Sequence, residues 1–158
     1  MKNSEITQIA LLTAIALIFG YIESLFPLPT AVPGIKLGLS NIVILFAVLR
    51  LGKKQSFLIL ILKVLVSSLL FSGVMSLAYA AAGGLCALFA MLAARRFSLG
   101  IIGISTAGGV FHNIGQIAAA CIVLSSYAPV YYLPFLIPAG VLCGILTGIV
   151  CKMVLKRV

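Results

Sequence analysis

Three short segments hold most of the polar chemistry of a chain that is otherwise strongly apolar. They are GGVFHNIGQ, with His112, Asn113 and Gln116, PGIKLGLSN, with Lys36 and Asn41, and LILILKVLV, with Lys63 at its centre. Imidazole, amide and ammonium groups can bind the polar groups of a ligand. Because ionisable side chains inside apolar segments are costly, each of them is a candidate for a function. The segments together predict recognition of a polar or charged molecule.

The first segment lies on a polar stripe. Ser105, Gly109, His112 and Gln116 recur at offsets of four, three and four residues, so they share one face of a helix with Asn113 beside it. Such a stripe can contact a ligand, form hydrogen bonds to neighbouring helices, or carry protons through the histidine. The sequence leaves these three interpretations open.

Lys63 lies about eight residues from the nearer end of its apolar stretch, which corresponds to a depth of ~12 Å at ~1.5 Å per residue. An ammonium group at that depth could bind an anionic group of a ligand or pair with a partner subunit. It could equally extend along its own alkyl chain toward water or donate to backbone carbonyls. Ligand binding and a purely structural role are both compatible with the sequence.

The segment from Pro33 to Asn41 follows a proline-rich stretch. Gly34 and Gly38 allow a close approach of the backbone, Lys36 supplies a positive charge, and Asn41 follows about one turn later. These residues could hold an anion at the start of a helix, where free N–H groups favour negative charge. The alternative is a tight turn whose lysine anchors the chain to lipid headgroups.

The chain lacks the side chains that most enzymes require. It has no Asp, and its only carboxylates, Glu5 and Glu23, are expected on opposite sides of a membrane, so no Mg²⁺ site is predicted. No GxxxxGK[ST] loop and no Ser, His and acid set are present. Four cysteines match no zinc or redox motif and are interpreted as small packing residues: Cys86, Cys121, Cys143 and Cys151. The sequence therefore predicts no catalytic site, metal or cofactor, and active transport would need a partner.

The elements that carry these residues are membrane spans. With 63% hydrophobic residues, 8% charged residues and a mean hydropathy of +1.32, the chain cannot cover a soluble core with polar side chains. Six apolar stretches approach the ~20 residues that cross a bilayer: residues 6–22, 35–49, 56–71, 74–94, 99–125 and 130–150. We interpret the first as a span and not as a secretory signal, because no convincing cleavage site precedes the following loop. The predicted fold is one all-α integral membrane domain of six transmembrane helices.

The positive charges predict the orientation of these spans. With six crossings, one side of the membrane holds Lys2, Arg50, Lys53, Lys54, Arg95, Arg96, Lys152, Lys156 and Arg157. The other side holds only Lys36. Because loops rich in Lys and Arg stay in the cytoplasm, both termini are expected inside, in a multi-pass protein of the cell membrane. The net charge of +9 then reflects topology and attraction to anionic lipids, and no nucleic-acid partner is expected.

Residues at two other places are suited to interfaces. Ala10 and Ala14 form a small-xxx-small pair, which lets helices approach closely either inside the bundle or in a partner subunit. Tyr127, Tyr131 and Tyr132 cluster between the last two spans, where an aromatic belt is expected at the membrane surface. A stacking platform for a planar ligand is the alternative for the tyrosines.

PGIKLGLSN, the six-span pattern and the polar fifth span resemble the Gx transporter family, often labelled heptaprenyl diphosphate synthase component I, over essentially the whole chain. The resemblance implies the fold of the substrate-binding S components of energy-coupling factor transporters. Those proteins have six helices, both termini inside, and a ligand pocket that opens outward beneath the loop joining the first two helices. By location, residues 25–34 would cap the pocket, and Asn113 and Gln116 would line it.

The same resemblance implies a partner. Ala10 and Ala14 match the small-residue motif with which S components dock onto a transmembrane coupling subunit that joins two ATPases. The label of a synthase component fits less well, because a chain without Asp departs from the Asp-rich motifs of prenyl diphosphate synthases. We therefore interpret that label as an association with isoprenoid or quinone metabolism and not as catalysis by this chain.

The sequence predicts a membrane subunit that captures a small molecule from outside and depends on a partner ATPase module for its release inward. The expected ligand-binding residues are Gly34, Lys36, Gly38, Asn41, Lys63, His112, Asn113 and Gln116. The alternative is a membrane subunit of a quinone- or flavin-linked extracellular electron-transfer system, or of an isoprenoid-associated system, without transport activity. A membrane prenyltransferase is disfavoured because the chain lacks the carboxylates.

Overall fold

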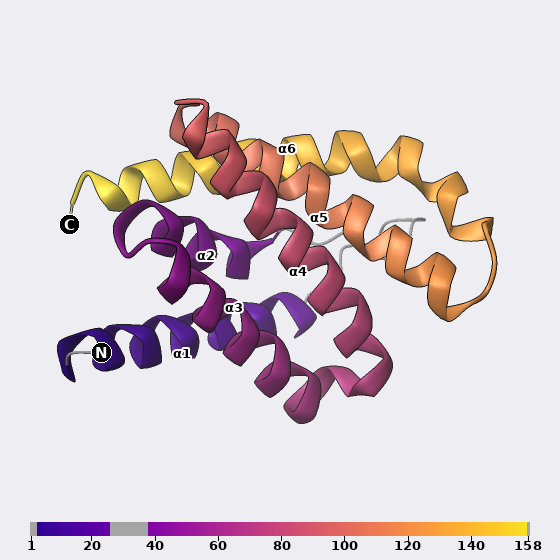
Figure 1. Cartoon of the computed structure of the whole chain (residues 1–158), viewed down its shortest axis with the longest axis horizontal. Helices are drawn as coiled ribbons and strands as arrows, with labels where there is room; N and C mark the ends of the chain where they lie inside the picture. The colour runs from indigo at the N-terminus through magenta and orange to yellow at the C-terminus, as the bar shows by residue number, and fades with distance from the viewer. Residues whose placement is uncertain (1–2, 26–37, 158) are drawn as a thin grey trace.

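The computed structural model describes residues 3–25 and 38–157, without the side chains of residues 71–75. Within these residues the chain forms six α-helices and no strand (Figure 1). The helices are α1 (Asn3–Leu25), α2 (Leu39–Arg50), α3 (Lys53–Ser67), α4 (Gly73–Arg96), α5 (Ile101–Val123) and α6 (Leu133–Leu155). A π-helical turn, Ser68–Ser72, joins α3 to α4, and a 3-10 turn, Ala128–Tyr132, precedes α6.

Each of the six apolar stretches that the sequence identifies overlaps one of these helices. By length and composition, four segments are able to cross a membrane: Asn3–Leu25, Ser76–Arg96, Ile101–Val123 and Ala128–Leu155. The helix α2 is shorter, with 12 residues, or about 18 Å at ~1.5 Å per residue. An all-helical protein with several membrane-length helices is therefore confirmed, whereas six crossings and their orientation stay predictions.

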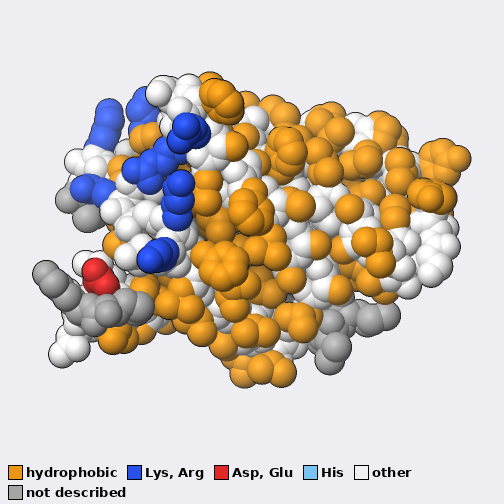
Figure 2. Space-filling model, viewed as in Figure 1, with side chains coloured by type: hydrophobic (Ala, Val, Ile, Leu, Met, Phe, Trp, Pro, Cys, Tyr) orange, Lys and Arg blue, Asp and Glu red, His pale blue; other side chains and the backbone are white. Residues whose placement is uncertain are grey.

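Both chain termini lie at the same end of the bundle (Figure 1). The space-filling view shows Lys and Arg side chains gathered at that end, while the rest of the visible face is mostly hydrophobic (Figure 2). The basic residues in the helix ends that meet there are Arg50, Lys53, Lys54, Arg95, Arg96 and Lys152. This separation of charge from apolar surface is what a protein with both termini on the cytoplasmic side would show.

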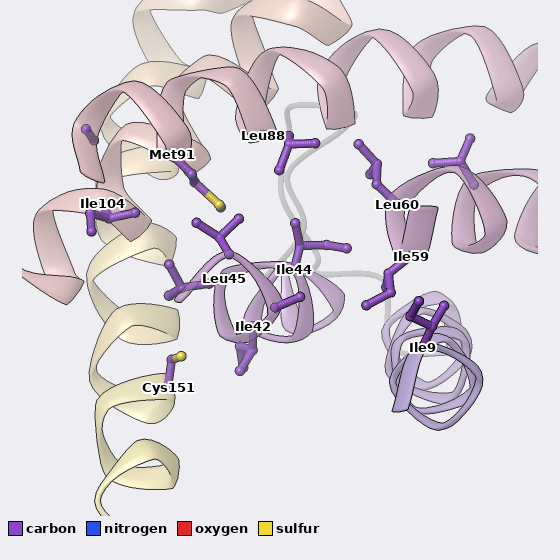
Figure 3. Close-up of a cluster of buried hydrophobic side chains, with 14 residues drawn as sticks. Ile9, Ile42, Ile44, Leu45, Ile59, Leu60, Leu88, Met91, Ile104 and Cys151 are labelled. Carbon is purple, nitrogen blue, oxygen red and sulfur yellow. The ribbon is translucent and has the colours of Figure 1, made fainter. Parts of the chain in front are cut away.

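The short helix α2 forms the centre of the hydrophobic core. It packs against α1, α3, α4 and α6, and most of its side chains between Ile42 and Val48 are buried. Figure 3 shows Ile44 and Leu45 pointing toward side chains of α4. The guanidinium of Arg95 donates to the backbone carbonyl of Val48 and so fixes the C-terminal end of α2. A helix that is covered on most sides needs no polar face, which explains why every residue from 42 to 49 is apolar.

The helix α5 packs tightly against both α4 and α6 because glycines remove side chains from the contacts. A Cβ atom on Gly144 of α6 would lie only 2.6 Å from the Cα atom of Thr106. One on Gly109 of α5 would lie 2.5 Å from the carbonyl oxygen of Gly140. On the other side of α5, a Cβ on Gly83 would lie 2.7 Å from the side chain of Gln116. Such close backbone approach stabilises helix pairs in lipid, where the hydrophobic effect between helices is weak.

We expect Gly144→Ala to destabilise the protein, because the added methyl group would meet backbone atoms of α5 that cannot move aside independently. The expected loss is about 1–3 kcal/mol of unfolding free energy, measured by titration with denaturing detergent. Gly103→Ala, on α5, is the matched control: its Cβ would meet only Leu99 at an ordinary 3.4 Å. Equal stability of the two variants would contradict the close packing of α5 on α6.

Candidate functional site

A polar cavity of about 110 Å³ lies inside the bundle, and all six helices contribute to its wall. Six of the residues that the sequence predicts as ligand-binding line this one cavity: Gly38, Asn41, Lys63, His112, Asn113 and Gln116. The other two, Gly34 and Lys36, and the predicted capping segment beyond Leu25 lie outside the described residues. The structure thus brings together residues from α2, α3 and α5 that are up to 78 positions apart in the chain (116 − 38 = 78).

The first turn of α2 forms one wall of the cavity. Gly38 precedes the helix with a φ of +74°, a left-handed conformation that glycine adopts without strain. The N–H of Asn41 donates to the carbonyl of Gly38 at 2.8 Å, which begins the helix. The N–H of Gly38 itself donates to a carboxylate oxygen of Glu23, near the end of α1. A charged side chain from α1 therefore holds the start of α2 in place.

Lys63 reaches the same turn from α3. Its ammonium donates to the hydroxyl of Ser40 at 2.7 Å, and both residues line the cavity. Of the interpretations that the sequence left open, this geometry favours an ammonium directed into the bundle over one extended toward the membrane surface. Whether it binds a ligand there stays a prediction.

The polar stripe of α5 faces the cavity along its length, with His112 at the middle of the helix. The amide of Asn113 donates to the carbonyl of Leu136 on α6 at 2.7 Å, so this residue forms the interhelical bond that was one of the predicted alternatives. The side-chain amides of Gln116 and Asn41 make no hydrogen bond to any residue that the structure describes. Both amides line the cavity.

Buried hydroxyls line the part of the cavity nearer the basic end of the bundle. The hydroxyl oxygens of Ser105 on α5 and Thr147 on α6 lie 2.9 Å apart. Thr147 donates its single hydrogen to the carbonyl of Cys143, so Ser105 is the donor in the bond between the two hydroxyls. This interhelical bond joins α5 to α6 in the cavity wall and gives both hydroxyls a partner.

Sequence reasoning missed five of the polar residues in this wall: Glu23, Ser40, Ser67, Ser76 and Thr147. Glu23 carried a usable signal, because it is an acid close to the end of an apolar stretch, where ionisable groups are costly. Ser40 and Thr147 carried none, since isolated hydroxyl residues are common in membrane helices and often bond to their own backbone.

A second hollow differs in character. A groove of about 770 Å³ lies between α1, α2 and α6, and its lining is almost entirely hydrophobic, with Gln8 and Arg50 as its polar members. Its surface suits apolar chains. The polar groups able to recognise a solute are concentrated in the smaller cavity.

The family comparison agrees with the sequence resemblance. The model of the family described as heptaprenyl diphosphate synthase component I matches residues 12–154. The chain belongs to the heptaprenyl diphosphate synthase component I family. The match includes every described residue that lines the polar cavity, from Ala16 to Thr147. Comparisons with curated proteins and with solved structures found no match.

Within the described residues of this family member, no three His, Cys, Asp or Glu side chains gather closely enough to hold a metal ion. The two carboxylates of the sequence, Glu5 and Glu23, lie on α1 and are separated by 18 residues, or about 27 Å at ~1.5 Å per residue. The two groups cannot ligate one ion together.

Asn113 and Gln116 both carry a side-chain amide on α5, but only Asn113 bonds to another described helix. We expect Asn113→Leu to lower the unfolding free energy by about 0.6–1.5 kcal/mol, because the carbonyl of Leu136 loses its hydrogen bond. Gln116→Met, which has a similar shape, should leave stability nearly unchanged because it removes no hydrogen bond to the part of the chain that the structure describes. Detergent titration of the two purified variants checks this difference. A larger loss for Gln116→Met would show that Gln116 has a structural role.

Proposed function

We propose that this protein is a substrate-binding membrane subunit, similar to the S components of energy-coupling factor transporters, which captures a small polar molecule from outside the cell. The observation that carries the proposal is the polar cavity inside a bundle of membrane-length helices. Lipid offers no partners to buried polar groups, so a wall containing amides, hydroxyls and charged groups is expected only where a polar molecule or water is held.

The position of the cavity supports access from outside. In the proposed topology the chain crosses the cell membrane six times and the basic end, with both termini, is cytoplasmic. Glu23 lies near the end of α1 remote from that basic end, and Gly38 follows residues 26–37 directly. The polar first turn of α2 is therefore near the connection between α1 and α2, on the side opposite the positive charges. This arrangement favours capture at the outer face.

We propose a non-catalytic role despite the name of the family. Transfer of a diphosphate generally uses Mg²⁺ held by clustered carboxylates, whereas Glu5 and Glu23 lie at opposite ends of α1. The cavity volume of about 110 Å³ is also small compared with the ~300–1,000 Å³ of pockets for larger organic ligands. A long prenyl chain does not fit such a space.

A partner must supply the energy for release inward, because the chain has no phosphate-binding loop. The name of the family as a first component is compatible with a partner. Ala10 and Ala14 are both exposed, on the side of α1 away from the buried Ile9, Thr13 and Ala16. The described helices therefore leave this small-residue pair uncovered, and we propose that it docks onto a transmembrane coupling subunit joined to ATPases.

Native mass spectrometry of the full-length protein tests ligand capture. We expect a small molecule to be retained after detergent extraction, and to be lost when two amides of the cavity wall are replaced in Asn41→Leu/Gln116→Met. Membranes that contain the protein should take up the same molecule in an ATP-dependent way. If nothing is retained or taken up, while deletion abolishes reduction of extracellular electron acceptors, the electron-transfer alternative is correct and the transport proposal is wrong.

Affinity purification tests the docking surface. We expect Ala10→Leu/Ala14→Leu to abolish co-purification of an ATPase-bearing partner, because the larger side chains prevent close helix approach. The variant should still retain ligand, since neither residue lines the cavity. Ala118→Leu, at an exposed position of α5, is the control and should co-purify normally. Unchanged co-purification of the double variant would show that α1 does not dock the partner.

A further inference from the structure

The hydrophobic groove lies where α1 and α6 flank α2. Both helices pack against α2 but not closely against each other. Figure 3 shows Ile9 of α1 and Cys151 of α6 on opposite sides of α2. The space of about 770 Å³ between them has buried side chains of α2, such as Ile42 and Val43, in its wall. Because these walls are apolar, an apolar chain is a better occupant of the groove than water.

Positive charge is concentrated at one end of the groove. Arg50, in the last turn of α2, is exposed and is the only charged residue among the described residues that line the groove. Lys53 and Lys54 follow it in the chain and are also exposed. Glu5 is the only acid that the structure describes at this basic end of the bundle. The excess of positive charge there favours an anionic group at the end of the groove.

The length of the groove matches one leaflet of a bilayer. On α1 its lining runs from Gln8 to Phe19, which are 11 residues apart (19 − 8 = 11), or about 16 Å at ~1.5 Å per residue. The hydrocarbon core of a bilayer is ~30 Å thick, so the acyl chains of one leaflet cover about 15 Å. Gln8 is nearer the basic end than Phe19 is, and Arg50 lies at that same end. A lipid with its headgroup at Arg50 and a chain reaching Phe19 therefore fits the groove in length.

The groove lies on a different face of α1 from the pair that we assign to a partner subunit. Starting at Gln8, the lining residues Leu12, Ile15 and Phe19 recur at offsets of four, three and four, so they share one face. Ala10 lies two positions after Gln8, or about 200° around a helix of 3.6 residues per turn, and the residue four positions after Ala10 shares its face. A partner docked on that alanine face leaves the groove open to lipid.

We propose that the groove binds one anionic phospholipid, with its phosphate at Arg50 and one acyl chain lying along α2 between α1 and α6. In the proposed topology the basic end faces the cytoplasm, and the cytoplasmic leaflet is the one that carries anionic lipids. No described residue lines both the groove and the polar cavity. Lipid binding is therefore tested separately from ligand capture, and either can fail without the other.

Native mass spectrometry of the purified full-length protein tests this site. The protein in detergent is given equal amounts of phosphatidylglycerol and phosphatidylcholine with identical acyl chains. We expect one phosphatidylglycerol to be retained per protein, with a preference of about fivefold or more over phosphatidylcholine, because a basic side chain attracts an anionic headgroup.

Arg50→Gln should remove this preference. Arg96→Gln is the matched control, because Arg96 is also exposed at the basic end but lies on α4 and does not line the groove. It should change the preference by less than about twofold, since exposed charges beyond the screening length contribute little.

A second pair of variants tests the seat of the acyl chain. Ile15→Trp should lower retention of both phospholipids, because the larger ring takes up space in the groove. Ile122→Trp makes the same change at an exposed position of α5 outside the groove and should retain lipid normally.

Three results would overturn the proposal. The first is equal retention of the two phospholipids by the unmodified protein. The second is an equal loss of preference in Arg50→Gln and Arg96→Gln, or equal lipid retention in the two tryptophan variants. The third is displacement of phosphatidylglycerol by a prenyl diphosphate at equal concentration, which would show that the groove holds an isoprenoid instead.

Discussion

The structure depends on hydrogen-bond partners for the polar first turn of α2, because this helix begins inside an apolar bundle. The helix α2 has 12 residues, while α1, α4, α5 and α6 have 23 or 24, so α2 spans only about half of the bundle. Its first N–H groups cannot bond within the helix and cannot bond to lipid. Glu23 accepts from the N–H of Gly38, the residue before the helix, and the ammonium of Lys63 donates to the hydroxyl of Ser40 in its first turn. The polar cavity lies beside this turn, which α1 and α3 reach through Glu23 and Lys63.

The rest of the fold keeps that polar interior separate from lipid. Glycines bring α5 against α4 and α6 at distances that no larger residue would allow, so the stripe with His112 and Gln116 faces inward. The bond between Ser105 and Thr147 joins α5 to α6 in the cavity wall. The apolar residues of α2 fill the remainder of the core around Leu45 and Val48. Stability and a ligand-sized space therefore come from the same close packing.

Much of this arrangement could be predicted from the sequence because lipid imposes simple rules. Helices that cross a membrane must be long and apolar, which predicted the membrane-length helices. Polar residues at offsets of three and four share one face of a helix, and this rule correctly predicted that the polar residues of α5 form one surface. The burial of α2 and the inward direction of Lys63 could not be predicted, since they depend on which helices surround them. Glu23 was missed for a related reason: its partner, Gly38, lies 15 residues away beyond a proline-rich segment.

The most direct test of the central claim is an experimental structure of the full-length protein purified in lipid nanodiscs. Our account predicts density for a small bound molecule beside the first turn of α2, within hydrogen-bonding distance of Lys63 or Glu23 and of the Gln116 amide. Side chains of His112, Asn113 and Gln116 directed at the lipid, or a cavity filled by protein side chains, would contradict it.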